Sequence, residues 1–115
     1  MTRKMNYSDL ITSIVKIAKQ EKVDNIKFDG YDNCLSRNSL TKEKRALSSI
    51  FLSKEEYDSF VKELFKEYDI KGALVKKHVE VQDYVLVFTG IDNSLLDSGK
   101  YLLSVRLIKK SVGAL

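Results

Sequence analysis

The residue types that most often carry out catalysis are scarce in this sequence. Its 115 residues include one histidine, His78, and one cysteine, Cys34. A hydrolase or transferase needs a nucleophile, a base and a group that orients the base, and histidine is the usual base. His78 follows Lys76 and Lys77, which favours a solvated surface position, and Cys34 has no neighbouring motif, which favours a structural thiol. We therefore expect no catalytic residue and no enzymatic activity.

Ligands for a metal ion or a phosphate group are equally scarce. One cysteine and one histidine exclude a structural zinc site built from this chain alone. Two turn-rich segments, 29–33 and 92–97, contain oxygen ligands, but neither follows the calcium-loop spacing with its closing glutamate. The sequence contains neither GxxxxGK[ST] nor GxGxxG, the glycine-rich patterns that hold phosphates. We expect no metal and no cofactor.

Basic residues are the remaining candidates for a site. The chain has a net charge of +4, and residues 1–50 hold ten Lys and Arg against six Asp and Glu, whereas residues 51–115 hold ten of each. A local basic run could contact the phosphates of a nucleic acid. The candidate nucleic-acid-binding residues are Arg37, Lys42, Lys44 and Arg45. Glu43 interrupts this run, and the tyrosines that could stack on bases fall mostly on predicted core stripes.

Composition and length indicate one folded domain spanning residues 1–115. Apolar residues make up 43% of the chain and charged residues 31%, which is typical of globular proteins and not of disordered ones. The chain is long enough for one core and too short for two. The absence of proline and the presence of only five glycines argue against a collagen-like or linker-like chain.

Several features favour a cytoplasmic location and no membrane insertion. A single cysteine cannot form an intramolecular disulfide, and the first residues are not followed by the apolar run of a signal peptide. The longest apolar stretches have four or five residues, against about 20 needed to cross a bilayer. Richness in lysine, isoleucine and asparagine suits a bacterial or phage source.

Two amphipathic helices are predicted. Residues 7–22 carry apolar side chains at the helical period, and Asn6 or Ser8 can cap the start. The second helix starts with a capping box of Ser53 and Glu56, with Leu52 and Tyr57 at the hydrophobic-staple positions. Its apolar stripe is aromatic-rich, and we expect it to end near Gly72. The stripe consists of Tyr57, Phe60, Val61, Leu64, Phe65 and Tyr68.

The strands are predicted from alternating apolar and polar residues. Ile26 and Phe28 predict a short strand that leads into a turn and permits a hairpin, residues 79–89 predict one strand, and residues 101–110 predict its antiparallel partner. Residues 36–52 fit either a helix or a second strand, and we favour the strand. The expected fold is α+β, with two helices on one face of a small antiparallel sheet in the order α-β-(β)-α-β-β.

Three short segments resemble a known family. The first helix followed by residues 24–30, the helix start at residues 52–56 and the late strand at residues 101–106 are similar to the N-terminal domain of secretion and pilus traffic ATPases. The resemblance covers most of the chain, although the ATPase core is absent. It implies an oligomer-forming accessory domain.

The sequence therefore favours a non-enzymatic protein-interaction or regulatory domain, such as an adaptor, an inhibitor or an accessory subunit. We expect another protein as the partner, and a homo-oligomer is compatible with the sequence. The alternatives are a nucleic-acid-binding protein that uses the basic 37–45 segment and the accessory domain related to traffic ATPases.

Overall fold

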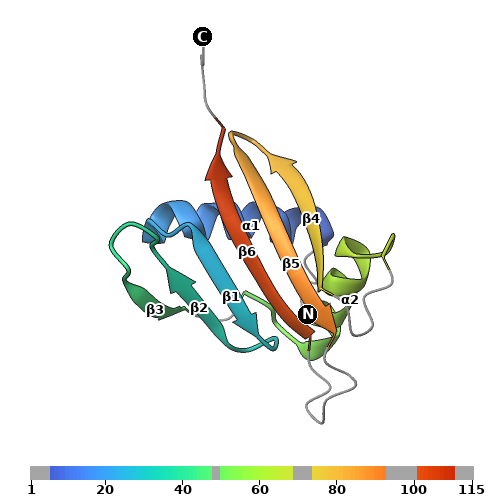
Figure 1. The fold of residues 1–115 in the computed structure, drawn as a ribbon. Helices are drawn as coiled ribbons and strands as arrows, with labels where there is room; N and C mark the ends of the chain where they lie inside the picture. Colours follow the sequence, from blue (N-terminus) through green and yellow to red (C-terminus); the bar gives the residue numbers. More distant parts are fainter. Residues whose placement is uncertain (1–5, 48–49, 69–73, 93–100, 111–115) are drawn as a thin grey trace.

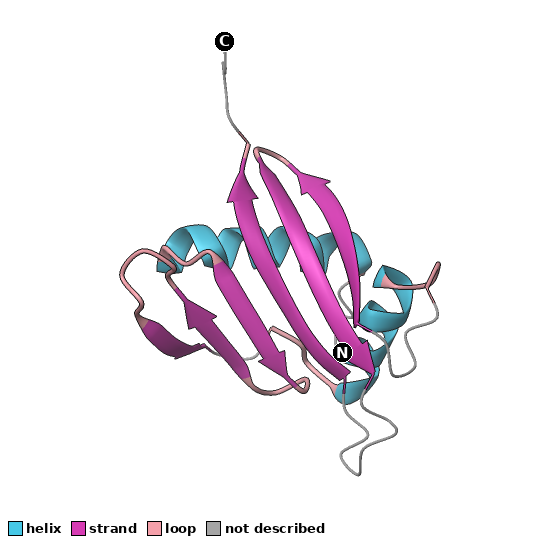
Figure 2. Cartoon of the chain, viewed as in Figure 1, coloured by secondary structure: helices cyan, strands magenta, loops and turns pink. Residues whose placement is uncertain are grey.

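The chain folds into two helices and one antiparallel sheet. The computed structural model describes residues 6–47, 50–68, 74–92 and 101–110, which contain all of the elements named below. The helices are α1 (Tyr7–Glu21) and α2 (Lys54–Leu64). The strands are β1 (Asn25–Asp29), β2 (Cys34–Arg37), β3 (Lys44–Leu47), β4 (Leu74–Val81), β5 (Tyr84–Asp92) and β6 (Tyr101–Lys109). Figure 1 shows both helices behind the sheet, and Figure 2 shows the same layers coloured by type. The predicted α+β class is confirmed.

The sheet joins two three-stranded units through the first and last strands of the chain. Its order is β3-β2-β1-β6-β5-β4, and all neighbouring strands are antiparallel. In the central pair, Ile26 of β1 lies opposite Val105 of β6. Both side chains are buried beneath the helices. The predicted element order is wrong in its strand number, because the described chain contains six strands instead of three or four.

The sequence did not reveal one of the strands, because the turn that separates it from its neighbour contains neither glycine nor asparagine. The predicted single strand at residues 79–89 is a hairpin, in which β4 and β5 meet at Val81 and Tyr84 around the turn residues Gln82 and Asp83. Two-residue hairpin turns need positive φ, which glycine and asparagine adopt most easily. Here Gln82 takes a φ of 55°. Valines continue on both sides of this turn, so the apolar pattern looks uninterrupted.

The segment at residues 36–52 is partly a strand, which is the alternative that we favoured from the sequence. Its first residues complete β2, residues 44–47 form β3, and the two strands pair as a hairpin. Asn38 organises the connection, because its side-chain oxygen accepts hydrogen bonds from the backbone N–H groups of Leu40 and Thr41 at 2.9 and 3.0 Å. The strand does not continue to Leu52 as predicted. Ile50 and Phe51 leave the sheet and are buried in the core.

Both predicted helix starts are confirmed. Asn6 accepts a hydrogen bond from the Asp9 N–H at 2.8 Å, and Ser53 accepts one from the Glu56 N–H at 3.1 Å. The Glu56 carboxylate reaches back to accept from the Leu52 N–H at 2.7 Å, which completes the capping box one residue earlier than the usual pattern. The predicted end near Gly72 lies outside the described residues, and α2 itself ends at Leu64.

The predicted hydrophobic staple is wrong. Leu52 is 64% exposed, so it does not pack on Tyr57. Phe51 occupies that role instead, with its ring centroid 5.0 Å from the ring of Tyr57. The reason is that the Leu52 backbone bonds to Glu56, which turns the preceding residue towards the core.

An aromatic cluster connects the helices to the sheet. It consists of Tyr7, Phe28, Phe51, Tyr57, Phe60 and Phe88. Phe60 of α2 has ring centroids 5.4 Å from Tyr7 of α1, 5.3 Å from Phe51 and 6.0 Å from Phe88 of β5. Phe51 in turn lies 5.4 Å from Phe28 of β1. Phe60 and Phe51 together therefore connect α2 to α1 and to both units of the sheet.

Replacing Phe60 tests this arrangement. We expect Phe60→Ala to lower the free energy of unfolding by about 3–5 kcal/mol, because it leaves a cavity where three rings meet. The control is Leu40→Ala at a side chain that is 93% exposed, which should change stability by less than about 0.5 kcal/mol. Urea unfolding followed by circular dichroism measures both. Equal, small effects of the two substitutions would show that the cluster is not the centre of the core.

Candidate functional site

The face of the sheet away from the helices is exposed, and we call it the open face. In β1 the buried residues Ile26 and Phe28 alternate with Lys27 and Asp29, which are exposed. Residues directly opposite each other in neighbouring strands share a face, so the strand register identifies the open face across the whole sheet. Opposite Lys27 lie Leu35 in β2 and Ser104 in β6.

A line of side chains that includes three cations crosses the open face from edge to edge, and we call it the cationic row. It contains one residue from each strand, in the spatial order Lys44, Arg37, Asn25, Arg106, Val87 and His78. Each neighbouring pair is a direct cross-strand pair. At about 4.8 Å between strands, the row spans about 24 Å. This length suits an extended contact with an anionic surface.

The basic side chains of the open face have no ion-pair partner among the described residues. Five cations lie there: Lys27, Arg37, Lys44, Lys76 and Arg106. All five are exposed, and no carboxylate in the described segments lies within 4.0 Å of their charged nitrogens. The face also carries Asp29 and Glu80, and the Glu80 carboxylate is 3.7 Å from the Lys110 ammonium. The open face is therefore net positive.

Apolar side chains lie between these cations. Leu35 is 44% exposed and Ile108 is 43% exposed. Val85 and Val87 in β5 are half-buried on the same face, opposite Ile108 and Arg106. Protein interfaces also combine apolar side chains with arginine.

The structure brings together two of the four residues predicted to bind nucleic acid. Arg37 and Lys44 are cross-strand partners on the open face. Arg45 points to the helix side, where its guanidinium lies 3.2 Å from the Glu21 carboxylate and 3.9 Å from that of Glu43. Lys42 is exposed in the β2–β3 connection, at a φ of 65°. The four residues therefore do not form one patch.

Sequence reasoning missed the other members of the open-face group. Lys27 and Arg106 occupy polar positions of alternating strands, so their exposure was readable from the pattern. Their proximity was not, because 79 positions separate them in a chain whose strand order was unknown. The pairing of β1 with β6 places Lys27 opposite Ser104 and Asn25 opposite Arg106.

The histidine and the cysteine lie on opposite faces of the sheet. His78 is exposed on the open face of β4. Cys34 is fully buried, and burial raises the pKa of its thiol, although a backbone hydrogen bond involving Ile50 opposes part of that shift. In the segments that the structure describes, no three His, Cys, Asp or Glu side chains gather where they could hold a metal ion.

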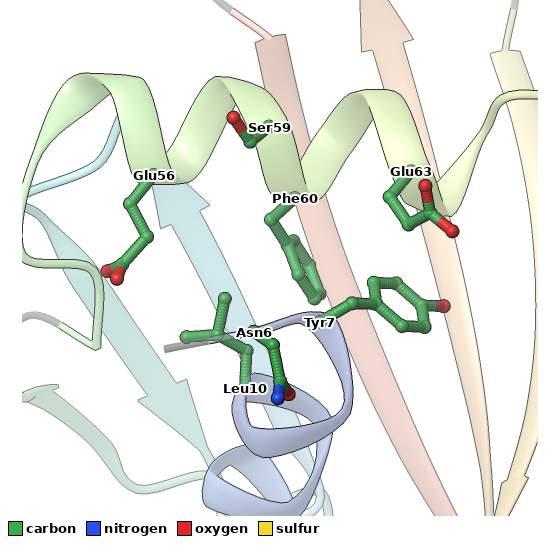
Figure 3. Close-up of a pocket in the computed structure, with 7 residues that line it drawn as sticks. All are labelled: Asn6, Tyr7, Leu10, Glu56, Ser59, Phe60 and Glu63. Atoms are coloured by element: carbon green, nitrogen blue, oxygen red, sulfur yellow. The ribbon is translucent and has the colours of Figure 1, made fainter. Parts of the chain in front are cut away.

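A cleft of about 280 Å³ lies between the start of α1 and the middle of α2. Figure 3 shows Asn6, Tyr7 and Leu10 from α1 facing Glu56, Ser59, Phe60 and Glu63 from α2. Glu56 is 4% exposed and caps α2, while Tyr7 stacks on Phe60. Burial, and to a lesser extent the nearby Glu63 carboxylate, raises the pKa of Tyr7. These groups hold the two helices together.

No protein-family model and no curated protein matches this chain. Over the part of the chain that the structure describes, neither helix is long and apolar enough to cross a membrane. The open face is the main candidate for a functional surface.

The raised pKa of Tyr7 predicts a loss of stability at high pH. Above its ordinary pKa of 10.0, Tyr7 ionises in the unfolded chain before it ionises in the folded one, so the folded state binds more protons and the free energy of unfolding falls. This contribution is fully present below pH 10 and disappears as the pH rises through the folded pKa. Tyr7→Phe should reduce the fall, as measured by urea unfolding between pH 8 and 11. Glu63→Gln should reduce it less, because burial is the larger cause.

Charge reversal on the cationic row should leave the fold intact. Arg37 and Arg106 are exposed and unpaired among the described residues, so we expect Arg37→Glu with Arg106→Glu to change stability by less than about 1 kcal/mol. Arg45→Glu should be the more destabilising substitution, because it places a third carboxylate beside Glu21 and Glu43. Thermal unfolding of the variants compares them. A larger loss from the double variant would show that the row contributes to folding.

Proposed function

We propose that this protein is a non-enzymatic interaction domain that binds an acidic surface of a protein partner through its open face. The observation that carries the proposal is the cationic row, in which basic side chains from both units of the sheet lie in register and have no carboxylate partner among the described residues. Unpaired charges attract an opposite surface and accelerate association. The traffic-ATPase resemblance implies an interaction role as well.

Arg37 and Arg106 are the expected anchors of the interface. Asn25 lies between them in the row, and Leu35, Val87 and Ile108 provide apolar area nearby. Arginine is enriched at the energetically important positions of protein interfaces, because its guanidinium makes bidentate bonds while its stem packs on apolar surface. We therefore expect a partner with carboxylates arranged around a small apolar patch.

Nucleic acid is the second candidate, favoured by the linear arrangement of Lys44, Arg37 and Arg106, which could follow a phosphate backbone. Binding of single strands usually adds aromatic side chains that stack on bases. None of the described side chains on the open face is Phe, Tyr or Trp, whereas Leu35, Val85, Val87 and Ile108 are apolar there. This composition favours the protein partner.

Site-specific crosslinking tests the proposal. Because Cys34 is buried, a cysteine introduced by Ser104→Cys can carry a photoreactive label on the open face. We expect that label to capture one acidic protein from native lysate at near-stoichiometric yield, with nuclease treatment having no effect. The matched control is Ser59→Cys, an exposed position on α2 behind the sheet, which should not capture that protein.

Adding Arg37→Glu with Arg106→Glu to the labelled protein should reduce capture at least tenfold. Recovery of nucleic acid instead, with loss of signal after nuclease treatment, would replace the first candidate with the second. Equal capture from Ser104→Cys and Ser59→Cys, or no capture at either position, would contradict both.

A further inference from the structure

Strand β4 forms one edge of the sheet and has no described strand beyond it. It has eight residues, and all of them pair with β5 on the inner side. In an antiparallel pair, alternate residues direct their N–H and C=O groups away from the partner strand. These groups are a template for another strand. The opposite edge, β3, has four residues, so β4 is the longer template.

The helix side of β4 is incompletely covered. Val75, Val79 and Val81 pack against the buried core but are half-buried, whereas Leu86 and Phe88 on the adjacent β5 are fully buried. The difference arises because each β5 side chain has strands on both sides and each β4 side chain has one. A seventh strand beside β4 would cover the valines with apolar side chains at every second position.

The charges of β4 restrict the partner. Lys76 and His78 lie on the open face of β4 and Lys77 on its helix side, opposite Phe88, and none has a carboxylate within 4.0 Å in the described segments. The one acidic residue of the strand, Glu80, is engaged with Lys110 at 3.7 Å. Pairing of β4 with β4 of a second copy would bring like charges together, which disfavours self-association. An acidic strand would neutralise the same charges.

We propose that the β4 edge binds an extended acidic protein segment as a seventh strand of the sheet. Alternate apolar side chains of that segment face Val79 and Val81 on the helix side, and carboxylates on its other face lie near Lys76 and His78. Backbone hydrogen bonds, which any extended segment can form, supply affinity, and the alternating side chains supply the selectivity. The proposal concerns the edge of the sheet and does not require the open-face interface.

A peptide of alternating valine and glutamate, eight residues long, is the probe. Two modified forms carry N-methyl groups on the four valines or on the four glutamates. Because alternate N–H groups of a strand point to opposite sides, one form loses its bonds to β4 and the other keeps them. We expect one form to bind at least tenfold more weakly than the unmodified peptide, and the other to bind within about threefold of it, by fluorescence anisotropy at low salt.

Amide hydrogen exchange of the intact protein provides the second readout. Addition of the peptide should slow exchange at alternate residues of β4 and leave β3 unchanged. Lys76→Glu with His78→Glu should weaken binding at least tenfold, whereas Lys54→Glu with Lys62→Glu, at exposed positions on α2, should not. Absence of binding, equal effects of the two methylated forms, or binding without slower exchange in β4 would overturn the proposal.

The two proposals can fail separately. Arg37→Glu with Arg106→Glu should leave peptide binding within about threefold, because neither residue lies on β4. Loss of open-face crosslinking with retained peptide binding would contradict the proposed function alone. The reverse result would contradict the edge interaction alone.

Discussion

The pairing of β1 with β6 is the constraint on which the rest of the structure depends. Each flanking unit, β1-β2-β3 and β4-β5-β6, is held by hairpins between neighbours in sequence, but the two units are joined by the first and last strands. Ile26 opposite Val105 and Phe28 opposite Leu103 place four buried side chains at this seam. Such a contact requires strands that are distant in sequence to meet, which makes it entropically costly to form.

The aromatic cluster stabilises the seam from one side. Phe60 and Phe51 connect α2 to rings from α1, β1 and β5, so the helices hold both units of the sheet together on the same face. Covering one face leaves the other in solvent. Alternation within each strand then sends charged side chains to the open face, where their hydration offsets the absence of packing.

The same geometry explains why two surfaces are candidates for binding. The register converts basic residues scattered through the sequence into a row, and the absence of a described strand beyond β4 leaves backbone groups and half-buried valines at the edge. Both surfaces are basic, so both suit acidic partners. The cleft between α1 and α2 is a weaker candidate for binding. Its Glu56 caps α2 and its Tyr7 stacks on Phe60.

The sequence by itself determined the α+β class, both helix starts and the exposure of His78. Helix caps and apolar periodicity depend only on residues that are close together in the sequence. The sequence also grouped Arg37 and Lys44 in one local basic run, and the β2–β3 hairpin of the structure places them opposite each other. It did not reveal the turn at Gln82, which carries positive φ without glycine, or the place of Phe51 in the core. Tertiary structure alone decided that Arg106 joins Arg37 and that Arg45 turns away to Glu21, because strand order and register are set by burial of residues distant in sequence.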